Sequence, residues 1–244
     1  YVGRDIDAPR FVKNSKESWY KEPLHKLNFF ERRFYKKTFD SALVHVAPTW
    51  VFEHLRKHPG NNVKMDLKPL DLTLFDNDVK PLEKKKEKFT FFCPQRMGIP
   101  KGTDILWEAL KFCKSDFEIL QVDWRDVGTD EEDSSSLSLR NNLPSQVKLI
   151  PMIKRKEMPS YYQWCDAVIG NLRIGSFEYV ELEAVMCKKP VINFTDKKIS
   201  IILNDEKIES PFIPENNDPK SIAQIIDKIV LSHEFRENIF KKEY

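Results

Sequence analysis

Residues 88–111 have the sequence KFTFFCPQRMGIPKGTDILWEALK. A run of residues that favour β-structure, Phe89–Pro94, comes first, and a short loop with Arg96 and Lys101 follows it. The next segment, Thr103–Cys113, has apolar residues at helical spacing. A strand followed at once by an amphipathic helix is the repeating unit of a parallel sheet covered by helices. This stretch therefore predicts an α/β fold.

The rest of the chain repeats the same alternation. We expect further strands at Phe117–Val122, Val147–Ile150, Ala167–Asn171 and Pro190–Phe194, and helices at Tyr179–Cys187, Pro219–Leu231 and Glu234–Lys242. The acidic, Ser-rich stretch Asp126–Ser136 has no such period and is expected to be an exposed, mobile loop. Residues 81–244 thus predict a nearly complete Rossmann-like domain.

The chain before this domain has a different order of elements. It contains two candidate strands, at Ala42–Ala47 and near Val63–Leu67, which is too little sheet for a complete doubly wound domain. Pro81 and the charged run Lys84–Lys88 are typical of a linker. We therefore expect residues 1–80 to be the end of a partial second Rossmann-like domain, with the linker.

Composition excludes several classes of protein. The 40 Lys and Arg residues nearly balance the 38 Asp and Glu residues, which leaves a formal charge of +2 and argues against a nucleic-acid partner. The four cysteines form no C-x-x-C pair, which suits a reducing cytoplasm. The only close histidine pair, His54 and His58, lacks a nearby third ligand, so no metal is expected.

Two loops contain residues suited to binding a diphosphate. Arg96 and Lys101 flank the start of the first predicted helix, whose aligned peptide dipoles and backbone N–H groups favour anions. In the second loop, Gly175 has no Cβ and allows close approach of a phosphate, and Ser176 can cap the next helix or donate to an oxygen. The alternative for both loops is that their charges are simply solvated.

Two spaced motifs then point to a family. The patterns K-G-x-D-x-x-x-x-A at Lys101–Ala109 and L-E-A-x-x-x-x-x-P-V-I at Leu182–Ile192 resemble those of the retaining, family-four glycosyltransferases of GT-B fold. VKLIPMIKRKEMPSYYQWCDAVIGN, residues 147–171, is similar to the segment that precedes the glutamate helix in that family. Upstream, LVHVAPTWVFEHL, VKMDLKPLDLTLF and YVGRDIDAPR resemble the end of an acceptor domain and its Gly-x-Asp loop.

The resemblance implies a fold, an activity and a site. The chain would combine the last part of an acceptor-side domain, residues 1–80, with a nucleotide-sugar-binding domain, residues 81–244. It would transfer a hexosyl group with retention from a UDP-sugar or GDP-sugar, without a metal or another cofactor. Arg96 and Lys101 would be catalytic, because they hold the donor diphosphate and stabilise it as it departs. The residues implied in substrate binding are Arg173, Gly175, Ser176, Phe177 and Glu183, the last through the ribose hydroxyls.

One departure from the family pattern leaves other functions open. The family's E-x7-E motif is broken, because Gly175 stands where its first glutamate, which contacts the sugar, is expected. A non-catalytic sugar-nucleotide-binding module and a nucleotide-sugar epimerase therefore remain as alternatives. The acceptor is unknown, with a lipid-linked molecule and a polysaccharide as the options. The basic amphipathic stretch Lys26–Lys37 predicts either peripheral membrane contact or ordinary packing against a sheet.

Overall fold

The computed structural model describes Arg33 and residues 45–47, 63–65, 70–75, 79–124, 130–175, 178–196, 201–203, 206–208 and 210–243. The Gly-x-Asp loop near Tyr1, the basic stretch Lys26–Lys37 apart from Arg33, and both Ser176 and Phe177 lie outside these residues. The chain divides into two compact units. One consists of residues 1–67 and 200–208, and the other of residues 68–199 and 209–244.

The smaller unit contains two short pairs of strands. β1 (His45–Ala47) pairs in parallel with β2 (Val63–Met65), and both lie inside the strands expected there. β8 (Ile201–Leu203) pairs antiparallel with β9 (Glu206–Ile208).

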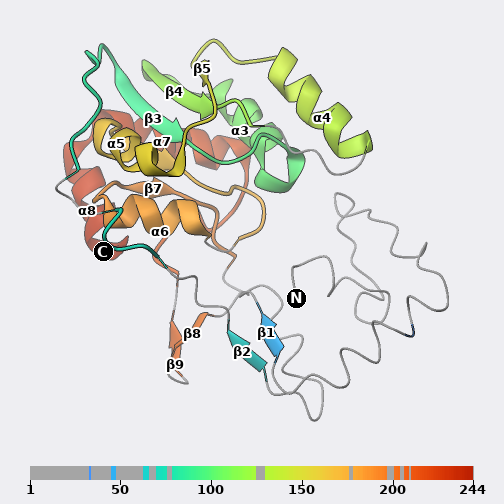
Figure 1. The fold of residues 1–244 in the computed structure, drawn as a ribbon. Coiled ribbons are helices and arrows are strands. Elements are labelled where there is room, and N and C mark those ends of the chain that lie inside the picture. The colour runs from blue at the N-terminus through green and yellow to red at the C-terminus, as the bar shows by residue number, and fades with distance from the viewer. Residues whose placement is uncertain are drawn as a thin grey trace. The chain divides into compact units, whose positions relative to one another are not determined.

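The larger unit is built on a five-stranded parallel sheet (Figure 1). Its strands are β3 (Phe89–Cys93), β4 (Phe117–Val122), β5 (Val147–Ile150), β6 (Ala167–Ile169) and β7 (Val191–Ile192). Their order is β5-β4-β3-β6-β7, and every neighbouring pair is parallel. The predicted α/β class and the five predicted strands are confirmed.

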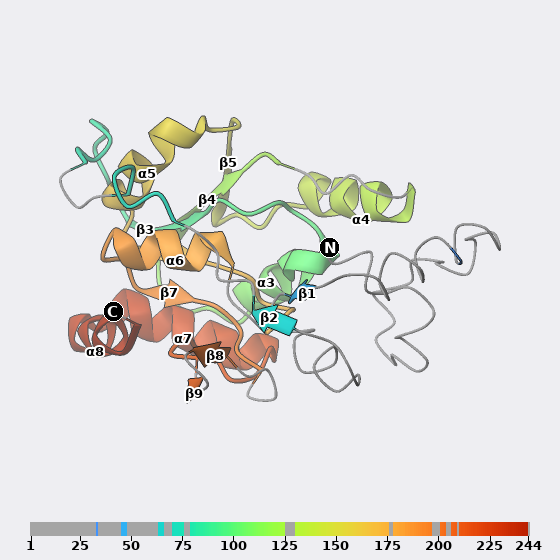
Figure 2. The same cartoon turned by 60° about the horizontal axis from the view of Figure 1, so that its bottom comes forward.

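Helices connect these strands and close the chain. Their bounds are α3 (Thr103–Leu110), α4 (Asp130–Asn141), α5 (Met158–Trp164), α6 (Tyr179–Met186), α7 (Pro219–Leu231) and α8 (His233–Glu243), with short 3-10 turns η3 (Ile99–Lys101) and η4 (Arg155–Glu157). Figure 2 shows α4 and α8 at opposite ends of the unit. No helix in the described part of the chain is long and apolar enough to cross a bilayer.

The prediction of a mobile loop over Asp126–Ser136 is wrong for its second half, because α4 begins at Asp130. The local sequence pattern did not reveal this helix, because the contacts that stabilise it come from other elements of the fold. Ser136 is completely buried, and the Arg140 guanidinium forms two hydrogen bonds of 2.8 and 2.7 Å with the Asp123 carboxylate after β4. Trp107 on α3 also donates from its indole N–H to the backbone carbonyl of Leu139.

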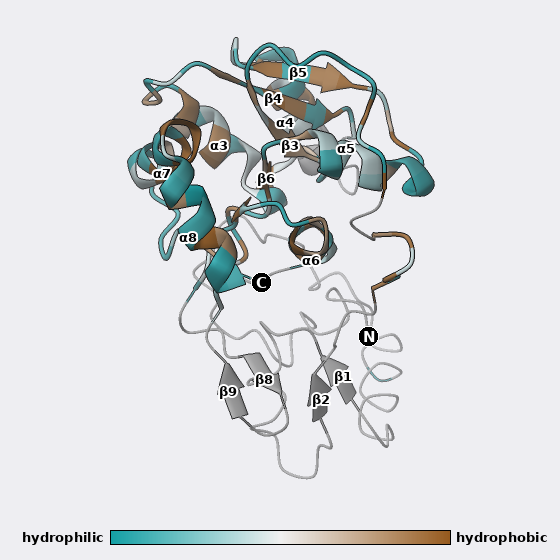
Figure 3. Ribbon diagram, turned by 90° about the vertical axis from the view of Figure 1, so that its left-hand side faces the viewer, coloured by the Kyte–Doolittle hydropathy of each residue, from teal (hydrophilic) through white to brown (hydrophobic). Residues whose placement is uncertain are grey.

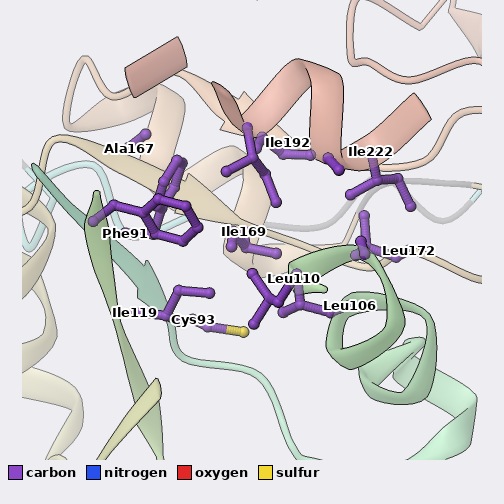
Figure 4. Close-up of a cluster of buried hydrophobic side chains, with 14 of the residues drawn as sticks. Phe91, Cys93, Leu106, Leu110, Ile119, Ala167, Ile169, Leu172, Ile192 and Ile222 are labelled. Atoms are coloured by element: carbon purple, nitrogen blue, oxygen red, sulfur yellow. The ribbon is translucent and has the colours of Figure 1, made fainter. Parts of the chain in front are cut away.

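The sheet separates two apolar layers because successive side chains of a strand point to opposite faces. One face carries Phe91, Ile119 and Ile169 and packs against α3, α7 and α8. The other carries Phe92 and Val168 and packs against α5 and α6. Figure 3 shows β3, β4 and β5 coloured mainly as hydrophobic and most of α8 as hydrophilic, and Figure 4 shows the first layer closely. A core on both faces holds the ends of the strands firmly in place.

Candidate functional site

The strand order of the larger sheet defines where a ligand is expected. β3 lies in the middle, and the chain adds β4 and β5 on one side of it before it returns to add β6 and β7 on the other. Open parallel sheets bind ligands outside the carboxyl ends of their strands, at the point where the strand order reverses. Here that point lies between β3 and β6. The loops that leave these two strands contain the two predicted diphosphate-binding sequences.

These two loops are held together by hydrogen bonds to the backbone carbonyls of the first loop. The Leu172 N–H donates to the Lys101 carbonyl at 3.2 Å, and the Arg173 Nε donates to the Ile99 carbonyl at 2.6 Å. Gly102 has a φ of 76°, and a Cβ there would lie 3.0 Å from the carbonyl carbon of Leu172. Only glycine allows this approach without strain. The fold therefore places the Lys101 loop and the Arg173 loop in direct contact.

Lys101 and Arg173 each have a carboxylate partner. Lys101 forms an ion pair with Glu178, and its side chain is only 12% exposed. Arg173 forms an ion pair with Asp104 in the first turn of α3. That Lys101 holds the donor diphosphate together with Arg96, and that Arg173 binds substrate, stay predictions. The two ion pairs show that an incoming anion must compete with the protein's own carboxylates.

The start of α6 is filled by two glutamates. Glu178 is the N-cap residue, and its carboxylate accepts a hydrogen bond from the backbone N–H of Glu181, while the Glu181 carboxylate accepts one from the Glu178 N–H at 2.6 Å. Glu181 also accepts from the Asn171 N–H at 3.0 Å and is buried. Burial raises its pKa, the charge of Glu178 raises it further, and the backbone hydrogen bonds oppose both effects. This helix end, expected to attract anions, already holds two carboxyl groups.

Arg96 and Lys101 both follow β3, but they contact different loops. Arg96 contacts a residue after β4, whereas Lys101 contacts the loop after β6. The Arg96 guanidinium carbon is 5.6 Å from the ring centroid of Trp124, which follows β4 and is 45% exposed. The Met97 N–H donates to the Trp124 carbonyl at 2.7 Å, which fixes the two loops relative to each other. A cation over an indole face is a favourable contact.

Glu183 is buried between α6 and α5. It forms an ion pair with Arg155, and its other oxygen accepts from the Tyr162 hydroxyl at 2.9 Å. The Arg155 guanidinium carbon also lies 4.6 Å from the ring centroid of Phe75. Burial raises the pKa of Glu183, and Arg155 and Tyr162 oppose that shift. The predicted contact with ribose hydroxyls stays a prediction, and it would have to use the remaining lone pairs of this carboxylate.

Gly175 lies very close to Asp196. Its φ is 79°, and a Cβ there would lie only 2.6 Å from the Cβ of Asp196. Its carbonyl accepts from the Asp196 N–H at 3.0 Å. A glutamate at position 175 would therefore require a different loop. The loop that carries the broken E-x7-E motif thus has a backbone conformation that suits glycine at position 175.

Sequence reasoning missed Arg155 and Tyr162, the partners of Glu183. Arg155 follows the carboxyl end of β5, so the rule that ligands bind at carboxyl ends was a usable signal for it. Tyr162 had no signal, because it was indistinguishable from a core aromatic residue. Within the described residues, no group of His, Cys, Asp and Glu is arranged to hold a metal ion.

A family model described as "Glycosyl transferases group 1" matches residues 75–244, which is well over half of the chain. A search of curated proteins gave no match.

Solved glycosyltransferase structures share the fold. A glycosyltransferase from Rickettsia africae is 21% identical, with a TM-score of 0.60, over 86% of this chain and 60% of that one. Anabaena Alr3699/HepE in complex with UDP-glucose is 17% identical, with a TM-score of 0.65, over 91% and 63%. The C-terminal domain of a group 1 protein (LpcC) from Francisella tularensis is 22% identical, with a TM-score of 0.52, over 72% and 95%. The chain thus spans about 60% of the first two proteins.

Proposed function

The chain belongs to the glycosyl transferases group 1 family, and from that premise we propose that its larger unit binds a nucleotide-sugar donor for transfer of the sugar with retention of configuration. In this reaction the bond between the anomeric carbon and the diphosphate breaks, and a bond to an acceptor oxygen forms on the same face of the sugar. The acceptor proton leaves, and the nucleoside diphosphate is released.

The observation that carries this proposal is the junction of the two loops at the strand reversal. Lys101 and Arg173 come from sequence motifs about 70 residues apart, yet the backbone hydrogen bond from Leu172 to Lys101 joins their loops at the carboxyl ends of β3 and β6. A rigid pair of cation-bearing loops at this place suits a diphosphate. Preorganised positive charge there would stabilise the departing group.

Each residue of the site has a proposed role. Arg96 and Lys101 balance the charge that develops on the leaving diphosphate, so the proposed reaction uses no metal cofactor. Glu183 accepts hydrogen bonds from the ribose hydroxyls. The loop that contains Arg173, Gly175, Ser176 and Phe177 lines the donor.

We propose a UDP-sugar as the first donor to test, with GDP-sugars as the alternative. The support is the structural likeness to Anabaena HepE, whose structure was determined with UDP-glucose. That likeness, at 17% identity, concerns the fold, so the base and the sugar need a direct measurement.

The remaining proposals concern the other partner and the setting. Residues 1–80 would supply part of an acceptor-side domain and residues 81–244 the donor domain. The acceptor would be lipid-linked or a polysaccharide, and Lys26–Lys37 would serve either as a peripheral membrane contact or as a stretch that packs against a sheet. We place the protein in the cytoplasm. All four cysteines are free thiols, and burial raises the pKa of each to about 12, which suits unreactive thiols in a reducing compartment.

Calorimetric titration with UDP, GDP and ADP tests donor binding. Arg96→Ala and Lys101→Ala should each weaken binding of the preferred nucleotide about tenfold to a hundredfold, because each removes a charge-assisted hydrogen bond worth about 1.5–3 kcal/mol. Lys111→Ala is the control, since it removes a cation from an exposed pair with Glu108. Unchanged affinity in both site variants would contradict the diphosphate assignment.

A second pair of variants tests the ribose contact. Glu183→Gln should weaken binding of the nucleoside diphosphate itself, because ribose is common to all donors, and Glu181→Gln should affect it less. Incubation with a labelled donor and candidate acceptors then separates the remaining functions. Transfer supports the enzyme, binding without turnover supports a binding module, and an epimerised donor supports an epimerase.

A further inference from the structure

Glu178 lies at the point where the proposed donor site needs positive charge. Its carboxylate pairs with Lys101 and accepts the backbone N–H of Glu181 in the first turn of α6. We propose that Glu178 determines the affinity of the donor site, because its carboxylate occupies the place of a donor phosphate and must leave when a nucleoside diphosphate binds. This inference rests on the proposed function of the site.

The two partners of this carboxylate are those that a phosphate oxygen would choose. An ammonium group and an N–H at a helix N-terminus both bind anions, and phosphates commonly use the two together. The Lys101 side chain is 12% exposed and that of Glu178 is 34% exposed, so water screens the lysine end of the pair only weakly. A donor phosphate at this place competes with Glu178 for the ammonium.

The surrounding contacts allow Glu178 to leave without undoing the helix. The backbone of residue 178 is held by the buried Glu181 carboxylate, which accepts its N–H at 2.6 Å and also accepts the Asn171 N–H. The first turn of α6 therefore stays anchored when the partly exposed Glu178 side chain swings out. In the loop after β6, the buried Asn171 Nδ2 has no hydrogen-bond partner among the described residues.

The charge of Glu178 then opposes donor binding in two ways. It neutralises Lys101 in the unliganded protein, and after displacement it remains a nearby negative charge that repels the diphosphate. Glu178→Gln removes the charge and keeps a side-chain oxygen that can accept the Glu181 N–H. We expect this variant to bind UDP about three- to tenfold more tightly than the parent at low salt, with a smaller gain at high salt.

The experiment is calorimetric titration of UDP into the parent, Glu178→Gln, Lys101→Ala and the double variant. Glu108→Gln is the matched control, because it removes a carboxylate from an exposed pair with Lys111 on α3 and should leave affinity unchanged. Lys101→Ala should cost more affinity in the Glu178→Gln background than in the parent, since the lysine is then no longer neutralised. Glu178→Ser, which keeps a good capping oxygen, guards against an effect peculiar to glutamine.

Tighter UDP binding by Glu178→Gln and by Glu178→Ser would support the inference, together with the larger cost of Lys101→Ala in the Glu178→Gln background. Equal or weaker binding in Glu178→Gln and Glu178→Ser, with the parent binding UDP and thermal unfolding showing both variants folded, would overturn it and leave the donor site standing. If neither the parent nor any variant binds UDP, GDP or ADP, the proposed function fails first and this inference fails with it.

Discussion

Buried glutamates lie near the carboxyl ends and near the amino ends of the strands in the large sheet, called here its carboxyl edge and its amino edge. The hydrogen bonds of these glutamates differ. At the carboxyl edge, both oxygens of Glu181 accept backbone N–H groups, at 3.0 and 2.6 Å. At the amino edge, one oxygen of Glu243 accepts the Val191 N–H at 3.1 Å, and the other has no hydrogen-bond partner among the described residues. Burial raises the pKa of Glu243 to about 9, so this carboxyl group is protonated at neutral pH.

The difference lies in how many groups oppose the effect of burial on the pKa of each glutamate. Glu181 has two backbone donors, and Glu183 has Arg155 and Tyr162, and these contacts oppose the desolvation that favours the protonated form. Among the described residues, one donor is seen for Glu243, the Val191 N–H. Burial raises the pKa of all three carboxyl groups, but several contacts oppose it at the edge where a ligand is expected, and a single backbone N–H opposes it at the other.

The largest expected effect is at Glu181. Glu181→Ala leaves two backbone N–H groups without their acceptor, each costing about 1–3 kcal/mol, so the free energy of unfolding should fall by about 2–6 kcal/mol. Urea unfolding followed by circular dichroism measures this. Glu157→Ala, at an exposed glutamate, is the control. A loss no larger than that of the control would mean that water replaces the carboxylate and that the α6 end is not rigid.

Glu243→Gln tests the neutral end of the comparison. Because the folded-state pKa lies above the ordinary value, the folded protein holds the proton longer, and stability is lost as pH rises from about 4.5 towards about 9. The variant should match the parent near pH 4.5 and exceed its free energy of unfolding by up to about 4–5 kcal/mol at pH 8, at about 1.4 kcal/mol for each pH unit above 4.5. Denaturant titrations across this range check it. A pH-independent difference would show that Glu243 keeps its charge.

The smallest effect is expected at Arg155, whose side chain is half exposed. Arg155→Ala removes the cation next to Glu183, so the pKa of Glu183 should rise further and stability should be lost as pH rises. The cost should be about 1 kcal/mol at pH 8 and less at pH 5. Thermal unfolding of this variant, with Lys156→Ala as an exposed control, measures the gap. Recovery in Arg155→Lys would assign the effect to charge, and failure to recover would assign it to the contact with Phe75.

The secondary structure of the large sheet could largely be predicted, because it depends on short-range pattern. Phe117–Val122 and Val147–Ile150 are short apolar or alternating runs between turn residues, and they form strands with the predicted bounds. α4 could not be predicted in this way. Its stability depends on the burial of Ser136 and on the pairing of Arg140 with Asp123, and neither contact is visible in local periodicity.

For the site, the sequence by itself determined which loops follow β3 and β6 and that they contain Arg96, Lys101 and Arg173. The order of strands in a parallel sheet is a non-local property, so only the tertiary structure decided that these loops touch. It also decided which neighbour each charge has. Lys101 faces Glu178, and Glu183 is enclosed by Arg155 and Tyr162, although a helix pattern alone places glutamates on a solvated face. Burial and pairing decide the state of a charged group, and both arise from residues distant in the chain.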